Sequence, residues 1–272
     1  MTTHLLSDLA LARRLERAEA HANAAFVEAR ATIDPAVGAG WCDVDGAWAM
    51  FDGVGSPLTQ TFGLGLFSTP SATQLEAIEA FFSARGADVL HEVSPMADPA
   101  LLGLLAERRY DVIEWSTVLA QPVHRPLARE AAIIVRRTTA DESDWWADIA
   151  AEGWGEQAAI VEFVRGLGRV SARATDTHCF VAFERDLPIA TGALHVHDGV
   201  ALFAGASTVP TARRRGAQRA LLEARLQFAA DAGCDLAMMV AQPGSTSQKN
   251  AQRAGFQVAY SRIKWQRGQH HP

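Results

Sequence analysis

The chain has 272 residues, of which 49% are hydrophobic, and its formal net charge is -6. This apolar content excludes an intrinsically disordered chain, and the length favours two domains over one. The acidic balance disfavours non-specific nucleic-acid binding, and no apolar run is long enough to cross a bilayer, so neither a nucleic acid nor a membrane is an expected partner.

The first part of the chain predicts alternating helices and strands, which is typical of an α/β domain. Ser71 or Thr73 can cap the second helix, and Asp98 followed by Pro99 marks the start of the third. Helices are expected at residues 5–31 (as one helix or two), 71–86 and 98–109, and strands at residues 47–67, 87–95 and 110–121.

A segment rich in proline and charge, residues 122–130, separates the two parts, so we expect domains at residues 1–125 and 126–272. In the second part, Asp198-Gly199 is a hairpin signal between strands. Strands are expected at residues 131–139, 178–184, 188–196, 200–209, 234–242 and 256–266, and helices at residues 141–154, 157–170, 216–232 and 245–255.

The two parts of the sequence echo each other. Residues 81–93 read FFSARGADVLHEV, and residues 227–240 read QFAADAGCDLAMMV. Each part places a helix, a strand, a helix and a strand in the same order at similar spacing. We interpret this as an ancient duplication of one α/β unit.

An arginine–glycine loop follows the strand at residues 200–209. The strand, the helix after the loop and the next strand form a unit that predicts a right-handed crossover between parallel strands. A helix N-terminus attracts phosphate through unpaired amides, Gly216 permits close approach, and Arg213, Arg214 and Arg215 add charge. The loop therefore predicts a pyrophosphate cradle. For RRRG alone, a solvated basic turn is the favoured alternative, and neither GxxxxGK[ST] nor GxGxxG after a strand is present.

The stretch STVPTARRRGAQRALLEARL resembles the acetyl-CoA signature of the GCN5-related N-acetyltransferase (GNAT) family. Pro210, Arg213 and Gly216 match the family pattern, while Gln218 stands where glycine or alanine is usual. Downstream, STSQKNAQRAGFQVAYSRIKW resembles the family's closing helix and strand. The resemblance covers residues 133–265. The first part has the same architecture without the loop and resembles a degenerate second copy.

The resemblance implies two tandem GNAT-like domains of α/β (α+β) class. Each is expected to hold a mixed, mostly antiparallel sheet flanked by helices, with a splayed parallel strand pair in the C-terminal part. Acetyl-CoA, or another acyl-CoA, is the implied cofactor, and direct attack by a primary amine is the implied reaction. The implied cofactor-binding residues are Ser207, Thr208, Val209, Arg213, Arg214, Arg215, Gly216, Ala217, Gln218, Arg219 and Asn250.

The catalytic groups are less evident in the sequence. Family members often carry a tyrosine where this chain has Ala251, so the usual acid for the leaving thiolate is missing. Ser247, one turn earlier, is the candidate acid. Glu152 and His195 are candidate bases for the attacking amine. For each of these three residues a purely structural role remains the alternative, as does core packing for the Trp145–Trp146 pair and Trp154.

A small-molecule amine is the expected acceptor, and the protein is expected to be a cytoplasmic monomer or homodimer. Trp41, Asp43 and Asp45 are remote candidates for the acceptor pocket. Three scattered cysteines without a CxxC pair indicate a reduced compartment and no metal site. Two rival functions remain open: a CoA-binding pseudoenzyme that acts as a sensor or scaffold, and a basic-patch nucleic-acid binder, which the acidic charge disfavours.

Overall fold

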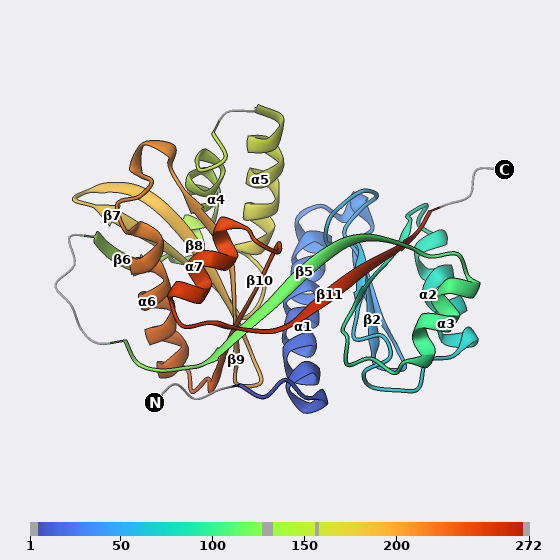
Figure 1. Ribbon diagram of the computed structural model, residues 1–272. Coiled ribbons are helices and arrows are strands. Elements are labelled where there is room, and N and C mark those ends of the chain that lie inside the picture. The colour runs from blue at the N-terminus through green and yellow to red at the C-terminus, as the bar shows by residue number, and fades with distance from the viewer. Residues whose placement is uncertain (1–4, 127–132, 156–157, 269–272) are drawn as a thin grey trace. The chain divides into compact units, whose positions relative to one another are not determined.

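The computed structural model describes residues 5–126, 133–155 and 158–268 (Figure 1). Its α-helices are α1 Leu9–Ile33, α2 Ala72–Ser83, α3 Ala100–Glu107, α4 Ser143–Glu152, α5 Ala158–Ser171, α6 Ala217–Asp231 and α7 Thr246–Arg253. Its strands are β1 Gly40–Val44, β2 Ala47–Phe51, β3 Gln60–Phe62, β4 Val89–Val93, β5 Asp111–Pro122, β6 Ile133–Arg137, β7 Thr177–Glu184, β8 Leu187–His197, β9 Val200–Thr208, β10 Leu236–Ala241 and β11 Gln257–Arg267. Short 3-10 helices are η1 Pro35–Val37, η2 Ala140–Glu142 and η3 Pro210–Ala212.

Of the one helix or two expected at residues 5–31, the structure has one, α1, which begins at Leu9. The other expected elements are present, with two differences in the first part. The strand region expected at residues 47–67 forms two separate strands, β2 and β3. Strand β1 was not expected, although Asp45-Gly46, the turn that joins it to β2, is a hairpin signal, and both residues have positive φ angles. Ser71, and not Thr73, caps α2, because its side chain accepts a hydrogen bond from the Gln74 amide.

Contacts divide the chain into two compact units. The first unit comprises Met1–Ala120 and Val240–Pro272, and the second comprises Gln121–Met239. The last segment joins the first unit because β11 pairs with both β4 and β5. A single boundary near residue 126 therefore does not separate the two units. The division into domains 1–125 and 126–272, as products of a duplication, stays a prediction.

The first unit has the strand order β1-β2-β3-β4-β11-β5, antiparallel except where β3 meets β4. Successive side chains of a strand point to opposite faces of the sheet, so β4 divides its residues between two layers. Val93 packs in an apolar core with Leu75 of α2 and Leu101 of α3. Glu92 points the other way, to the face that α1 covers.

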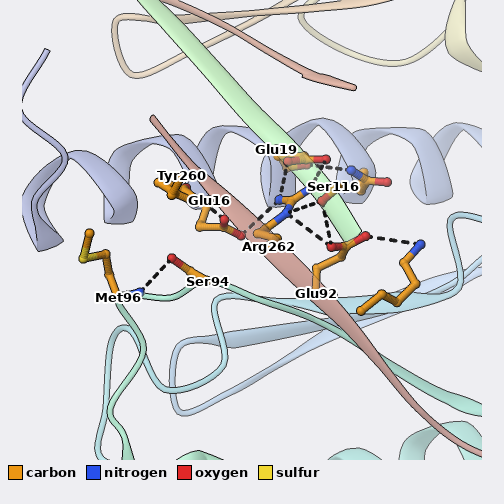
Figure 2. A network of polar contacts seen from close by, with 10 residues as sticks. Glu16, Glu19, Glu92, Ser94, Met96, Ser116, Tyr260 and Arg262 are labelled. Atoms are coloured by element: carbon orange, nitrogen blue, oxygen red, sulfur yellow. Dashed lines mark hydrogen bonds and ion pairs between the residues drawn. The ribbon is translucent and has the colours of Figure 1, made fainter. Parts of the chain in front are cut away.

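A buried network of charges joins α1 to that face of the sheet (Figure 2). Arg262 of β11, whose side chain is 2% exposed, forms ion pairs with Glu16 and Glu19 of α1 and with Glu92 of β4. Tyr260 donates a hydrogen bond to Glu16. Because one arginine holds three carboxylates from two different elements, α1 and β4, its position in β11 fixes α1 against the sheet.

The second unit has the strand order β10-β9-β8-β7-β6. One face packs against α4, where Trp146 lies in an apolar core with Cys179 and Val181. The opposite face packs against α6, where the Phe228 ring contacts the rings of His178 and Phe180. This alternation along β7 gives the unit three layers, as in Figure 1.

Strands β9 and β10 are parallel, as the crossover prediction requires, and they separate early. Only residues 200–202 of β9 pair with residues 236–238 of β10. Beyond that point β9 continues to Thr208 with only β8 as a partner, and Ala204, Gly205 and Ala206 are exposed. The expected splayed pair is therefore present, with small residues along its open stretch.

Candidate functional site

The loop between β9 and α6 leaves the first amides of the helix open. Gly216, at the N-cap of α6, has a φ of 91°, and no side chain among the described residues caps the helix. A Cβ placed on Gly216 would meet nothing within 4 Å. Open space therefore lies beside a helix N-terminus, which carries partial positive charge and unpaired N–H groups.

The corresponding helix of the first unit is closed. The N-cap Ser71 of α2 accepts a hydrogen bond from the Gln74 amide at 3.1 Å. The loop before α2 also lacks arginine. The start of α2 is thus capped by a side chain, whereas the start of α6 is not. The prediction that the first part lacks an anion site agrees with this difference.

The three arginines of the loop have different surroundings. Arg213 donates to the Gly153 carbonyl oxygen at 2.8 Å, and Arg215 pairs with Glu184 at 2.7 Å. Arg214 has a φ of 65° and, among the described residues, no polar partner. Of the three, Arg214 is therefore the arginine whose guanidinium forms no hydrogen bond or ion pair with the described residues. Arg213 connects the loop to the end of α4.

The end of β9 is held by several side chains. Buried Ser207 donates from its hydroxyl to the Ala150 carbonyl oxygen at 2.7 Å. The Gln218 amide donates to the Ser207 carbonyl oxygen and to the Thr208 hydroxyl, both at 2.8 Å. Gln218, unusual at its position in the signature, therefore fastens the first turn of α6 to β9 through its side chain, a role that the sequence did not indicate.

The backbone of Thr208 remains directed away from β8. The Val209 amide donates to the Ile189 carbonyl oxygen at 2.9 Å. Bonded and non-bonded pairs alternate along an antiparallel ladder, so Thr208, opposite Ala190, belongs to a non-bonded pair. Among Ser207, Thr208 and Val209, Thr208 is therefore the residue whose amide and carbonyl group do not bond to β8.

The structure brings Glu152 close to the end of β9. It is exposed and is the last residue of α4, next to Gly153, whose carbonyl group binds Arg213. A Cβ on Gly153 would lie 1.7 Å from the Ser207 hydroxyl oxygen, so this turn packs directly on β9. Glu152 is therefore the one of the two candidate bases that stands near the open stretch.

His195 lies elsewhere in the same unit. It is 3% exposed, its Nδ1 is 3.1 Å from the Thr177 hydroxyl oxygen, and it pairs with Leu202 where β9 is still joined to β10. This position argues against His195 as the base. Trp146, at 1% exposure, donates to the Phe180 carbonyl oxygen, so it is a core residue.

Ser247 and Asn250 belong to α7, in the first unit, and both are exposed. Asn250 accepts a hydrogen bond from Arg253. Ala251, at the position of the missing tyrosine, is 2% exposed. Because the arginine loop lies in the second unit, the assembly of these residues into one site stays a prediction.

The two tyrosines of the chain are already engaged within the first unit. Tyr110 donates to Glu79 and Tyr260 donates to Glu16. Burial and the neighbouring carboxylates raise the pKa of both phenols. Neither phenol is poised to supply the acid that the resemblance implies.

The remote acceptor candidates are used by the hairpin itself. Asp43 accepts from the Gly46 amide and from the Trp48 indole, and Trp41 stacks on Trp48 with ring centroids 4.4 Å apart. Asp45 occupies the turn. These contacts account for the residues structurally, and an acceptor role for them stays a prediction.

Sequence analysis missed Arg225 of α6. Arg225 is 2% exposed, and it lies on the buried stripe of α6 with Ala217, Leu221 and Ala229. The sequence contained a signal for this residue, because Arg225 follows Leu221 by four positions on the apolar face of the predicted helix. An arginine buried at such a position requires a specific partner.

Comparisons with known proteins agree with this architecture. Residues 140–256 match the model of the Acetyltransferase (GNAT) family. This range runs from the start of the helix pair α4–α5, through the open loop, to the turn after α7. No curated protein matches the sequence.

Solved structures extend the likeness to the whole fold. A GCN5-related N-acetyltransferase from Kribbella flavida superposes with a TM-score of 0.64 at 19% identity, covering 91% of this chain and 96% of that one. A tandem GNAT protein from the clavulanic acid biosynthesis pathway gives 0.58 at 13% identity, covering 83% of this chain and 79% of that one. The chain therefore has a tandem GNAT fold.

Two further observations bear on the kind of site. Among the described residues, no group of three or more His, Cys, Asp and Glu side chains is arranged to hold a metal ion. Across the same described ranges, every helix is too short or too polar to cross a bilayer.

Proposed function

We propose that the chain is an acyl-CoA-dependent N-acyltransferase that transfers an acyl group, with acetyl as the first candidate, to a primary amine of a small molecule. The observation that carries the proposal is the uncapped N-terminus of α6 beside Gly216, following the splayed end of β9. The match of residues 140–256 to the GNAT family model supports acyl transfer as the kind of reaction.

The residues present fit such a ligand. The amides of residues 214–219, with the guanidinium of Arg214, form a site for a diphosphate. The Thr208 backbone and the open stretch of β9 offer hydrogen bonds to the amide groups of an extended pantetheine arm. CoA supplies an activated thioester when bound, and the protein contributes orientation and backbone N–H groups.

The acid and base remain proposals. An amine with an ordinary pKa near ~10 must lose a proton before it attacks. Glu152, exposed at the end of α4, is the base that we favour, either directly or through water. Ser247 of α7 is the proposed acid for the thiolate, and Asn250 is a proposed contact of the pantetheine arm.

A second function is favoured by one observation. The position that often carries tyrosine in the family holds Ala251, which is buried and has no acid group. A protein that binds acyl-CoA without turnover, as a sensor or scaffold, would have this property.

The first prediction concerns Gly216. We expect wild-type protein to bind acetyl-CoA in a calorimetric titration and Gly216→Leu to bind at least about tenfold more weakly, because the new side chain fills the space beside the helix amides and must adopt a positive φ. The control is Gly233→Leu at the other end of α6, where φ is also positive (79°) and a Cβ meets nothing within 4 Å.

Equal loss of affinity in both variants would show that backbone strain, and not the cradle, is responsible. Absence of binding to wild-type protein would refute the proposed function. Thiol release from acetyl-CoA in the presence of a panel of primary amines separates the two candidates: turnover supports the enzyme, whereas binding without turnover on any amine supports the sensor.

A further inference from the structure

Arg225 is a buried cation without a buried anion. Burial lowers the pKa of its guanidinium to about 10, so the group stays charged at neutral pH. No carboxylate among the described residues forms an ion pair with it. An uncompensated buried charge costs several kcal/mol, roughly, so this residue requires a specific explanation.

Its partners are carbonyl groups at an irregularity of the sheet. Nη1 donates to the carbonyl oxygens of Ala193, at 3.0 Å, and Ala204, at 3.3 Å. These two residues are register partners on β8 and β9, and the ladder shifts register directly beside them. One nitrogen therefore joins both strands at a β-bulge, where Gly205 has a φ of 59°.

Two glycines make this arrangement possible. A Cβ on Gly192 would lie 2.8 Å from the Arg225 guanidinium carbon, so only glycine leaves room for the side chain. On the other face, a Cβ on Gly205 would lie 3.2 Å from the ring of Trp146. The bulge is thus held by α6 from one side and by α4 from the other.

The contact sets the direction of one peptide group. In a planar trans peptide, the C=O and the N–H that follows it point in opposite directions. Because the Ala204 carbonyl group is turned toward Arg225 and β8, the Gly205 N–H points away from β8. Beyond residue 202, β9 has no pairing with β10, so this N–H faces the splayed stretch.

We propose that Arg225 is a positioning residue that fixes the bulge of β9 so that the Gly205 amide donates a hydrogen bond to the carbonyl group of the bound acyl thioester. The proposal rests on the proposed function and assigns to this chain a residue that keeps the donor in place. A charged donor forms stronger hydrogen bonds than a neutral one, which suits a contact in which a single nitrogen holds two carbonyl groups.

The test measures carbonyl polarisation, which needs no acceptor. Acetyl-CoA labelled with ¹³C at the thioester carbonyl is bound to each protein, and its C=O stretch is recorded by difference infrared spectroscopy. A hydrogen bond weakens the C=O bond, so we expect the band of the wild-type complex to shift to lower frequency than that of free acetyl-CoA.

Arg225→Met should retain binding within about threefold and lose most of the shift. Arg225→Lys should keep part of it, because a single nitrogen already makes both carbonyl contacts. Removing a preorganised oxyanion donor costs about 100-fold in rate, so turnover on any accepted amine should fall in kcat more than in KM. Val170→Ala, a buried change in α5, controls for general destabilisation and should leave the band unchanged.

If Arg225→Met does not fold, Gly192→Ala provides the second variant, since it displaces the guanidinium without removing its charge and should also reduce the shift. A folded Arg225→Met or Gly192→Ala that binds acetyl-CoA with the full wild-type shift would overturn the role of Arg225 and leave the proposed function standing. No binding to the wild-type protein would overturn both.

Discussion

Glu16 is a carboxyl group that the fold holds in a fully buried position. Desolvation raises its pKa from 4.5 to about 7, although Arg262 acts in the opposite direction. Between these values the folded protein keeps a proton that the unfolded chain has released. The contribution of Glu16 to the free energy of unfolding is therefore greatest at low pH and falls as pH rises from about 4.5 to 7.

The prediction at this position is a pH-dependent effect of Glu16→Gln. Near pH 5 the neutral amide should resemble the protonated wild-type group. By pH 8 the variant should have gained about 2 kcal/mol relative to wild type, because it has no charge to desolvate. Urea unfolding of both proteins across this range measures the difference. Parallel curves would mean that Glu16 does not retain its proton in the folded state.

His91 also makes the stability of the wild-type protein depend on pH, so the effect of Glu16 has to be measured as the difference between variant and wild type. His91 is fully buried, and burial lowers its pKa from 6.5 to about 3. The unfolded chain binds a proton there that the folded protein rejects, so its contribution to stability rises with pH between about 3 and 6.5. The two groups oppose each other over part of the range, and the wild-type curve alone would hide both effects.

At the scale of elements, the start of α6 depends on side chains that fasten it to its neighbours. Gln218 holds β9, and Arg213 holds the end of α4. The helix N-terminus is thus fixed in place without being capped, which leaves its amides for a ligand. A cradle of this kind needs both conditions, since a mobile helix start would lose affinity through the cost of ordering.

Gln218→Ala tests this interpretation. Loss of two hydrogen bonds should destabilise the protein by about 1–2 kcal/mol and weaken acetyl-CoA binding several-fold, although the backbone amides remain. Thermal unfolding and calorimetry measure the two effects. Gln227→Ala removes a side-chain contact with Asp231 on the same helix and should leave affinity unchanged. Unchanged affinity in Gln218→Ala as well would show that α6 needs no such fastening.

The elements themselves were largely predictable from sequence. Apolar spacing located the helices, and Ser71, Asp198-Gly199 and Gly216 marked their ends and turns, because these are local properties of the chain. The fastening contacts were not predictable. Gln218 meets the end of β9, and Arg225 meets a bulge, only after distant segments have been brought together, and a bulge has no signature in hydrophobic alternation.

At the scale of the molecule, the two compact units do not coincide with the two linear halves of the sequence. Strand β11 comes from the second half and lies between β4 and β5. In the second unit, the chain continuing from β5 lies beside the start of β10, where the Val123 amide donates to the Asp235 carbonyl oxygen. Long-range pairing of strands decides this, and local pattern contains no information about it.

The prediction for the molecule concerns fragments. A fragment of residues 1–125 should not fold, because β4 and β5 lose their common neighbour, and Glu16, Glu19 and Glu92 lose Arg262. A fragment of residues 121–239 contains the whole second unit and should retain cooperative structure. Circular dichroism and urea unfolding distinguish them. A stable, cooperative 1–125 fragment would show that β11 is dispensable to the first unit.

The place of β11 also governs the order of events during translation. Domains usually form as they leave the ribosome, the N-terminal one first. Here the first unit is incomplete until β11 has been made, and the second unit is made in between. Until then three carboxylates face a gap in the sheet and two strands have unpaired edges, which are features that chaperones bind and that aggregate when left exposed. The second unit does not need β11, so we expect it to form before the first unit is complete, in the reverse of the usual direction.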